Sequence, residues 1–323
     1  MKKYISLLIT LILLFSIKSY NQQSSISVGI LPFQPVPKSS RLKNLSEQVI
    51  SGLSTVLFNY KFIKLIERSK TSEIFKEIKL GMTGLVDVNS AVKAGKLHGI
   101  KVLITGTVHR NKIYSRAIHV ETGKIIASSS VNNSSFINLL GKNLARGIET
   151  YLARENLKNM RNNSRDIDFK IWVENLSRNR NKHLKPGQRG TMKISDKVVF
   201  HFKSNRDGYV TIVDIQPGGD VVILFPNDLS PNNKIYAGKH YSIPSKDDAF
   251  EIVVSEPAGR DTIVAFFTKR KVKWLDRKLL TGEGFKTVKD GQKLTMTRGF
   301  KINATRLKRK NWESKAIEID VSR

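Results

Sequence analysis

Residues 102–131 read VLITGTVHRNKIYSRAIHVETGKIIASSSV, and this stretch decides the fold of the first half of the chain. It begins with Val102-Leu103-Ile104, an apolar run that predicts a buried strand of about seven residues. Two segments of alternating apolar and polar residues follow, 114–120 and 124–131. The Glu121-Thr122-Gly123 turn between them predicts a hairpin, so we expect three consecutive strands here.

Strands and helices alternate on both sides of this stretch. Apolar residues recur every four positions after Asn44, so they would line one face of a helix. We expect Asn44 to cap the start of this helix. Further strands are expected at 26–31 and 62–67, a short helix at about 90–97 and a long helix at about 135–157. Together these elements predict a mixed sheet covered by helices.

The second half has the pattern of an all-β module. Short apolar segments recur between turns, at 169–173, 198–203, 209–215, 221–225, 250–255, 262–267 and 316–321. Asp207-Gly208 and Pro217-Gly218-Gly219-Asp220 predict hairpins, because glycine accepts the positive φ of tight turns. The fold class expected for the whole chain is α+β, with a β-sandwich-like second domain.

The first residues are typical of a secretory signal peptide. Lys2 and Lys3 precede an apolar run of twelve residues, and small polar residues then allow cleavage after Ser19. Twelve helical residues span about 18 Å, less than the roughly 30 Å of a bilayer core, although an uncleaved anchor is an alternative. We expect an exported protein, periplasmic or associated with the outer membrane, without a membrane span in its mature chain.

The predicted domain organisation follows from these patterns. A signal peptide occupies residues 1–19, and the α/β domain spans 26–157. Residues 158–168 lack an apolar period and are the predicted linker. The second domain spans 169–323.

Charge gives the main indication of binding. The 323 residues carry a net charge of +29, which selects anionic partners. Basic clusters near Trp274 and Trp312 predict an anion-binding surface, although a merely solvated basic face would give the same pattern. The candidate anion-binding residues are Lys269, Arg270, Lys271, Lys273, Arg277, Lys278, Arg306, Lys308, Arg309 and Lys310.

No constellation of residues predicts catalysis, a cofactor or a metal ion. The chain has no cysteine, which excludes disulfides, thiolate metal sites and N-terminal lipoprotein acylation, and its six histidines lack metal-ligand spacing. The acids of Asp247-Asp248, or Asp214 with Asp220, could pair as carboxylates, but we favour a role as solvated turn formers. We therefore expect no catalytic, cofactor-binding or metal-binding residues.

Six segments of the first domain occur in an order that is typical of one protein family. They are Val28-Gly29-Ile30-Leu31-Pro32-Phe33, Leu65-Ile66-Glu67-Arg68, Ala94 to Gly99, Leu103 to Val108, Thr122 to Ser128 and Ile148-Glu149-Thr150. In these segments the first domain, over about residues 26–157, resembles the curli-assembly CsgG family, with its LpoB-type and FlgO-type relatives. The resemblance implies an exported protein that binds partners and catalyses nothing.

Two features differ from the channel-forming members of that family. This chain has no lipid-bearing cysteine, and only about residues 109–113 separate two sheet strands. A membrane strand needs roughly 9–11 residues, so a pore is disfavoured.

Five short motifs of the second domain also occur in a characteristic order. They are Asp207-Gly208-Tyr209, Leu224-Phe225-Pro226-Asn227, Ala237-Gly238, Ile243-Pro244 and Glu256-Pro257-Ala258-Gly259. In these motifs the second domain resembles domain-of-unknown-function family 4384, over a core of about residues 190–270. That family has no assigned chemistry, so the resemblance implies only a fold and an envelope context.

The sequence thus predicts a non-enzymatic envelope protein. Its first domain binds an envelope protein partner or forms a homo-oligomer, and its basic second domain contacts anionic components, with peptidoglycan or anionic lipid headgroups as candidates. The alternative is a collar or plug subunit of an outer-membrane secretion or assembly complex. Nucleic-acid binding is a lesser alternative that rests on charge alone.

Overall fold

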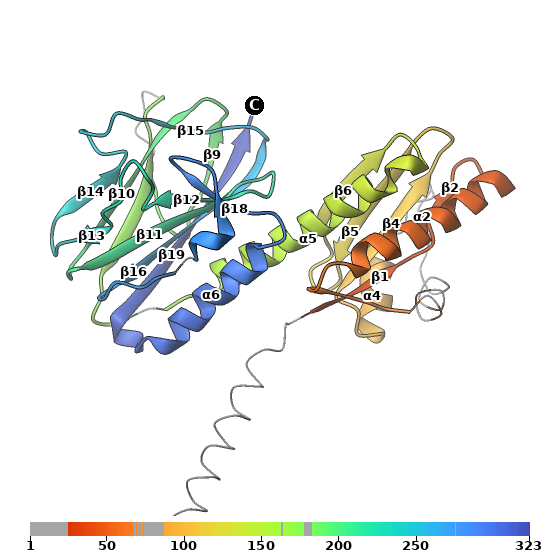
Figure 1. Cartoon of the computed structure of the whole chain (residues 1–323), viewed down its shortest axis with the longest axis horizontal. Helices are drawn as coiled ribbons and strands as arrows, with labels where there is room; N and C mark the ends of the chain where they lie inside the picture. Colours follow the sequence, from red (N-terminus) through yellow and green to blue (C-terminus); the bar gives the residue numbers. More distant parts are fainter. Residues whose placement is uncertain are drawn as a thin grey trace, which may run out of the picture. The chain divides into compact units, whose positions relative to one another are not determined.

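The computed structural model describes residues 25–323 apart from 68, 70, 72, 74, 75, 77–86, 163, 178–182 and 275. The architecture is α+β, as expected (Figure 1). The chain divides into two compact units, Met1–Ala145 and Arg146–Arg323, and the division falls within helix α5 (Ile137–Lys158). The predicted signal peptide lies outside the described residues. Within them, no helix has both the length and the apolar character needed to cross a membrane.

The first unit contains one mixed sheet. Its strands are β1 (Ile26–Ile30), β2 (Gln34–Pro35), β3 (Ile63–Leu65), β4 (Val102–Val108), β5 (Ile113–His119) and β6 (Lys124–Val131). Their order is β3-β1-β4-β5-β6, with β2 paired to β4; β1 is parallel to β3 and β4, whereas β5 is antiparallel to β4 and β6. The strand predicted to start at Val102 and the hairpin around Gly123 are therefore confirmed.

Gly106 explains why β4 and β5 can pair so closely. A Cβ at this position would lie 2.0 Å from the carbonyl oxygen of Tyr114 and 2.4 Å from the ring of Phe33. No side chain fits there, because the obstructing oxygen belongs to the backbone of the adjacent strand. The glycine of the quoted stretch is thus required by packing on the sheet.

Two helices lie side by side in the first unit, α2 (Ser40–Phe58) and the first turns of α5 (Figure 1). A third helix, α4 (Val88–Leu97), packs against Leu103. The expectation that Asn44 caps the first helix is wrong: Ser39 is the N-cap, and its side chain accepts a hydrogen bond from the Leu42 backbone N–H. Serine is a preferred N-cap residue, and the earlier start buries Leu42 on the same apolar face.

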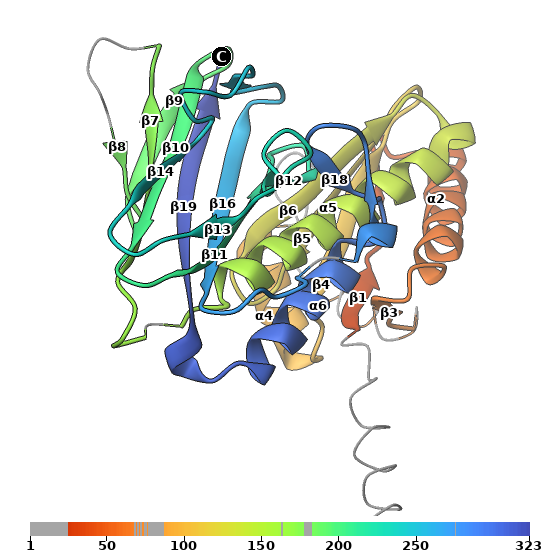
Figure 2. The ribbon, with the colours of Figure 1, turned by 60° about the vertical axis from the view of Figure 1, so that its left-hand side comes forward.

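The second unit contains two sheets. Its strands are β7 (Phe169–Asn175), β8 (His183–Leu184), β9 (Arg189–Lys193), β10 (Lys197–Ser204), β11 (Gly208–Ile215), β12 (Val221–Phe225), β13 (Lys234–Ile235), β14 (His240–Ile243), β15 (Ile252–Val253), β16 (Gly259–Thr268), β17 (Leu280–Thr281), β18 (Lys286–Val288) and β19 (Trp312–Ser322). One sheet has the order β14-β10-β7-β8 with β15 on β10; the other has β17-β18-β12-β11-β16-β19-β9 with β13 on β11. The two sheets face each other (Figure 2). Apolar side chains of both sheets form one buried cluster.

The two glycine turns of the second half differ in role. The turn at 217–220 joins the antiparallel strands β11 and β12, and Gly219 has a φ of +96°, so this hairpin is confirmed. The hairpin expected at Gly208 is wrong, because β10 and β11 belong to different sheets. Gly208 is needed instead for space: a Cβ there would lie 2.4 Å from the ring of Phe267 and 2.5 Å from the Thr268 carbonyl oxygen.

A second apolar cluster covers the other face of the larger sheet. It joins Val213 and Phe266 of the sheet to Leu157 of α5 and Phe300 of α6 (Lys293–Arg306), a helix that the sequence did not predict. Trp274 stacks on Phe300 with ring centroids 5.0 Å apart. Helices α5, from Arg146 onward, and α6 are therefore part of the core of this unit.

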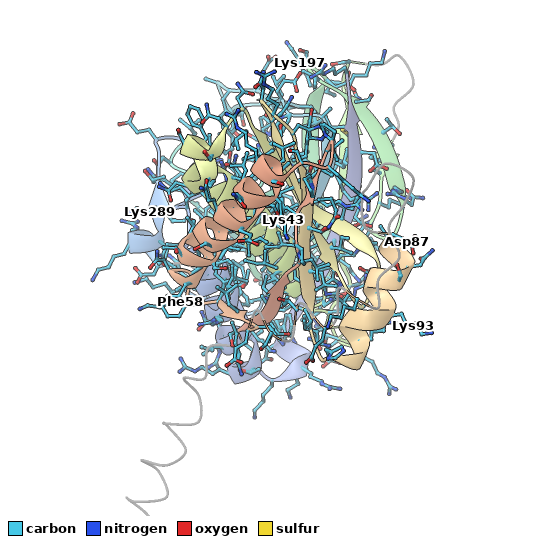
Figure 3. All side chains as sticks on the ribbon, turned by 90° about the vertical axis from the view of Figure 1, so that its right-hand side faces the viewer. Lys43, Phe58, Asp87, Lys93, Lys197 and Lys289 are labelled. Carbon is cyan, nitrogen blue, oxygen red and sulfur yellow. The ribbon has the colours of Figure 1, made fainter. Side chains whose placement is uncertain are left out.

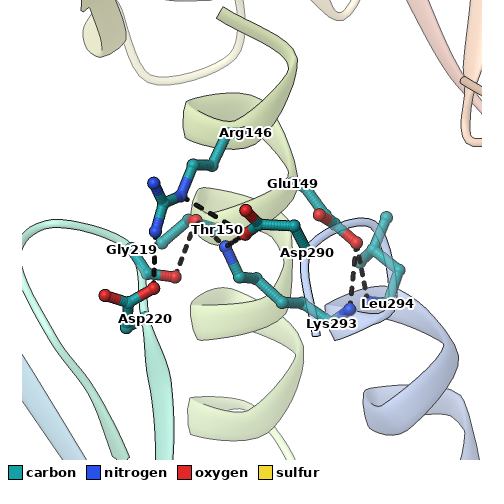
Figure 4. A network of polar contacts seen from close by, with 8 residues as sticks. All are labelled: Arg146, Glu149, Thr150, Gly219, Asp220, Asp290, Lys293 and Leu294. Carbon is teal, nitrogen blue, oxygen red and sulfur yellow. Dashed lines mark hydrogen bonds and ion pairs between the residues drawn. The ribbon is translucent and has the colours of Figure 1, made fainter. Parts of the chain in front are cut away.

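A polar network joins these two helices to the β11–β12 turn (Figure 4). Arg146 of α5 donates to Asp220 at 2.5 Å, and Thr150 donates to the Gly219 carbonyl oxygen at 3.3 Å. One turn away, Glu149 Oε1 accepts hydrogen bonds from the backbone N–H groups of Lys293 at 3.0 Å and Leu294 at 3.4 Å. A side chain of one helix thus caps the first turn of the other.

Candidate functional site

The ten basic residues predicted to bind anions lie at the surface, but the structure divides them. The Lys269 backbone N–H donates to the Asn311 carbonyl oxygen, which brings the segment after β16 next to the basic turn η4 (Arg309–Asn311). Asn303 of α6 donates to the Lys273 carbonyl oxygen at 3.0 Å. Arg277 and Lys278 instead form the turn η3 (Arg277–Leu279), whose backbone is bonded to Asp276 and Lys289.

The expectation that two tryptophans share this basic surface is wrong. Trp274 and Trp312 are 5% and 8% exposed, and both belong to the apolar cluster under α6. Their indole rings pack in the apolar cluster that also contains Phe300 of α6. These two indole rings are therefore not part of the basic surface.

A groove of about 700 Å³ on the smaller sheet combines cationic side chains with an aromatic ring. Lys170, Lys185, Lys203 and Lys315 line it together with Trp172. Lys203 is directly opposite Lys170 in the pairing of β10 with β7. Like charges at directly opposed positions destabilise a sheet, so this arrangement favours an anion that neutralises them. Two of the lysines are ion-paired, Lys170 with Asp168 and Lys315 with Glu313.

Beside this groove, two histidines come together that are 39 positions apart in sequence. His201 Nδ1 lies 3.1 Å from His240 Nε2, and its Nε2 lies 2.8 Å from Glu174 Oε2. Trp172 stacks on both rings. Burial lowers the pKa of His201, against the opposing effect of Glu174. Among the residues that the structure describes, no three His, Asp or Glu side chains are arranged to hold a metal ion.

A pocket of about 420 Å³ opens between the two sheets, and two aspartates are among the residues that line it. Asp214 follows Val210 and Ile212 on the inward face of β11, and Asp261 precedes Ile263 and Ala265 on the inward face of β16. Because Asp214 pairs with Ile263, the two carboxyl groups are diagonal neighbours on the same face. Most other residues of the lining are apolar.

Burial controls the ionisation of this aspartate pair. It raises the pKa of Asp214 well above the ordinary value, and the Asp261 carboxylate raises it further while Arg154 opposes the shift. Burial likewise raises the pKa of Asp261 to about 7, against the effect of Arg154. Two carboxyl groups this close compete for one proton, as like charges disfavour double ionisation.

Arg154 of α5 donates hydrogen bonds to the backbone near the aspartate pair, at the end of β11 and the start of β16. Its Nη2 atom donates to the carbonyl oxygens of Gln216 at 3.3 Å and Arg260 at 3.2 Å. Burial lowers the pKa of Arg154, but the two aspartates and Glu155 oppose that shift. The guanidinium supplies the positive charge that allows a carboxylate to exist in this interior.

The sequence did not reveal this pair. The expectation that Asp214, like Asp220, is a solvated turn former is wrong, since Asp214 is 7% exposed within β11. Asp220 lies in the turn and pairs with Arg146. Asp248 does form a turn, accepting a hydrogen bond from the Ser245 backbone N–H. An aspartate inside an apolar strand, as in Tyr209 to Ile215, was the available signal.

Comparison with solved structures gives distant matches, each of which covers less than half of this chain. A PelC dodecamer from Paraburkholderia phytofirmans is 10% identical, covering 38% of this chain and 87% of that one, with a TM-score of 0.25. The LpoB C-terminal domain from Salmonella enterica is 14% identical, covering 34% and 83%, with a TM-score of 0.24. No curated protein matches the chain. By sequence, the chain is similar to the curli production assembly/transport component CsgG over residues 22–111 and to the domain of unknown function DUF4384 over residues 191–271.

Proposed function

We propose that this protein is a non-enzymatic component of the cell envelope, exported and either periplasmic or associated with the outer membrane. Its CsgG-like first unit binds a protein partner or a second copy of the chain. Its sandwich-like second unit holds an anionic envelope component. The similarity to CsgG supports the envelope context, and the lysine-lined groove is the observation that carries the binding function.

The edge strand β6 is the part of the first unit best suited to pairing with another chain. It has eight residues and pairs with β5 alone among the described strands. It contains no proline, and its charge is confined to Lys124 at one end, so it lacks the usual protection of an edge strand. Ile125 is 52% exposed on it. Such an edge can add a strand from a partner through backbone hydrogen bonds.

Replacing Ile125 by lysine is expected to weaken this association. A charged side chain on an edge strand opposes pairing with a second strand. Light scattering during gel filtration should show the wild-type chain as an oligomer that dissociates on dilution, and Ile125→Lys as a smaller species. Phe58→Lys is the matched control, because Phe58 is 79% exposed at the end of α2 and projects outward (Figure 3). A monomeric wild type at all concentrations, together with no bound envelope protein after crosslinking in cells, would refute this part of the proposal.

The groove of the second unit suits a carboxylate-bearing glycan such as peptidoglycan. Its opposed lysines, Lys170 and Lys203, supply the charge, and Trp172 supplies a flat ring at the same place. A concave site can hold a chain on several sides, whereas the ten predicted cations are spread over exposed turns. The groove is therefore our first choice for the anionic contact, and the ten-residue surface is the second.

The variant Lys170→Gln/Lys203→Gln is expected to bind isolated peptidoglycan about tenfold more weakly at low salt, because two exposed charge contacts are lost. Its stability should not fall, since two opposed cations are removed. Co-sedimentation with peptidoglycan at low and high salt measures the effect. Lys269→Gln/Lys271→Gln is the control; weaker binding in that variant alone would assign the contact to the predicted surface. Equal binding of anionic vesicles, with none to peptidoglycan, would show that the ligand is a lipid headgroup.

A further inference from the structure

The pocket between the two sheets contains hydrogen-bond acceptors that have no donor. The Oδ1 atoms of Asp214 and Asp261 are both buried, and neither has a hydrogen-bond partner among the residues that the structure describes. A buried acceptor without a donor costs about 1–3 kcal/mol, and more when it is charged. Asp214 and Asp261 are among the residues that line a cavity of about 420 Å³, which is large enough for a small organic molecule.

The residues that line the pocket indicate which kind of ligand fits it. Phe200, Val222 and Ile319 are among the apolar residues that line it, and they come from both sheets. Glu251 also lines the pocket, but its carboxylate is bonded to Lys197 at 2.8 Å. A ligand that fits has an apolar body and a head that donates hydrogen bonds.

We propose that this pocket binds a small amphipathic amine, whose primary ammonium group donates hydrogen bonds to Asp214 and Asp261 while its apolar body lies between the sheets. An ammonium group has several donors and no acceptor, which matches two carboxylate oxygens in one place. A metal ion fits less well, because hard cations require six or more oxygen ligands and the remaining walls are largely apolar. An anion would be repelled by the carboxylates.

Charge balance supports an ammonium group. With both aspartates ionised, Arg154 leaves one negative charge uncompensated, and a bound ammonium makes the group neutral. When the pair retains one proton, it is already neutral with Arg154, and a bound ammonium would leave a buried positive charge. Two other nearby charges are paired elsewhere, Arg260 with Asp320 and Glu251 with Lys197, and Glu155 has the smallest effect among the charges that act on Arg154. Binding is therefore coupled to release of a proton from the pair.

Calorimetry on the full chain tests the proposal with 4-phenylbutylamine as the probe, and with 4-phenylbutan-1-ol and 4-phenylbutyrate as matched controls. We expect the amine to bind in preference to both at pH 8, and at least about tenfold more weakly at pH 5.5. Asp214→Asn and Asp261→Asn should each weaken the amine by at least about tenfold, while the exposed Asp247→Asn should not. Buffers of different ionisation enthalpy should reveal release of a proton at pH 7.

The inference is wrong if none of the three probes binds, if the alcohol binds as tightly as the amine, or if both asparagine variants bind the amine like the wild type. Because the pH arm uses the unaltered chain, it does not depend on the folding of any variant. The outcome is independent of the anionic groove, whose lysines line a different cavity.

Discussion

Replacing Glu149 by alanine is expected to destabilise the second unit by about 3–5 kcal/mol. Glu149 is 2% exposed, and it accepts the backbone N–H groups of Lys293 and Leu294 at the start of α6. The residue at the N-cap position, Gln292, forms no side-chain cap. Without Glu149 the first turn of α6 therefore loses its acceptor and the favourable negative charge at a helix N-terminus.

The same substitution also isolates a buried cation. The Lys293 side chain is fully buried, and its Nζ atom lies 3.4 Å from Thr150 Oγ1 and 3.5 Å from Asp290 Oδ1 (Figure 4). Burial lowers the pKa of Lys293, and the Glu149 carboxylate is the main group that opposes this shift. A buried charge that loses its principal counter-charge is costly, more so than a pair that is replaced as a whole.

Tryptophan fluorescence during urea unfolding measures this effect. All three tryptophans, Trp172, Trp274 and Trp312, lie in the second unit, so the signal reports on that unit alone. Glu149→Gln keeps an acceptor oxygen and should lose less stability than Glu149→Ala. Glu149→Ala/Lys293→Met removes the isolated cation and should recover part of the loss, as a double-mutant cycle would show. If Glu149→Ala unfolds at the same urea concentration as the wild type, the network contributes nothing to stability.

Helix α6 shows why part of the fold could not be predicted. Its sequence contains glycine, several threonines and an asparagine, all weak helix formers, and its apolar residues are few. It forms because Glu149 caps it from another element and because Phe300 packs on Trp274 and Phe266. Both interactions involve residues that are distant in sequence, so the sequence of the helix itself does not indicate them.

The strands of the quoted stretch were predictable for the opposite reason. In β4 and β6 the local pattern and the tertiary environment agree, and both strands begin and end where the sequence indicated. Short strands such as β9 and β14 have no such pattern, because each adds only a few residues at a sheet edge.

The two pocket aspartates also could not be predicted from local sequence, because they meet only in the folded chain. Asp214 and Asp261 are 47 positions apart, so no spacing rule brings them together, and only the pairing of β11 with β16 makes them neighbours. The ten surface cations were visible in the sequence because most of them stand in short runs of adjacent basic residues. The groove lysines were missed because they come from separate strands.

Stability of the second unit is expected to fall by about 2–4 kcal/mol as the pH rises from 4 to 8, through the Asp214–Asp261 pair alone. Burial raises the pKa of Asp261 to about 7, and that of Asp214 also rises, whereas an aspartate of the unfolded chain titrates near 3.8. The folded protein therefore binds a proton more tightly than the unfolded chain. The stabilisation is fully present below about pH 4 and is lost as the pH rises through 7.

Asp261→Asn isolates this contribution. The amide keeps the shape of the side chain but has no proton to lose, and the remaining Asp214 carboxylate is balanced by Arg154. The variant should resemble the wild type near pH 4 and be more stable by about 2–4 kcal/mol at pH 8, because the wild type there has two buried carboxylates beside one guanidinium. Urea unfolding at several pH values, followed by tryptophan fluorescence, measures the difference, with Asp247→Asn as the control for loss of an exposed acid. If the free energies of unfolding of variant and wild type differ by the same amount from pH 4 to pH 8, the two aspartates do not share a proton. A shared proton would make the variant's gain in stability appear only as the pH rises from the pKa of the unfolded aspartate to that of the folded pair.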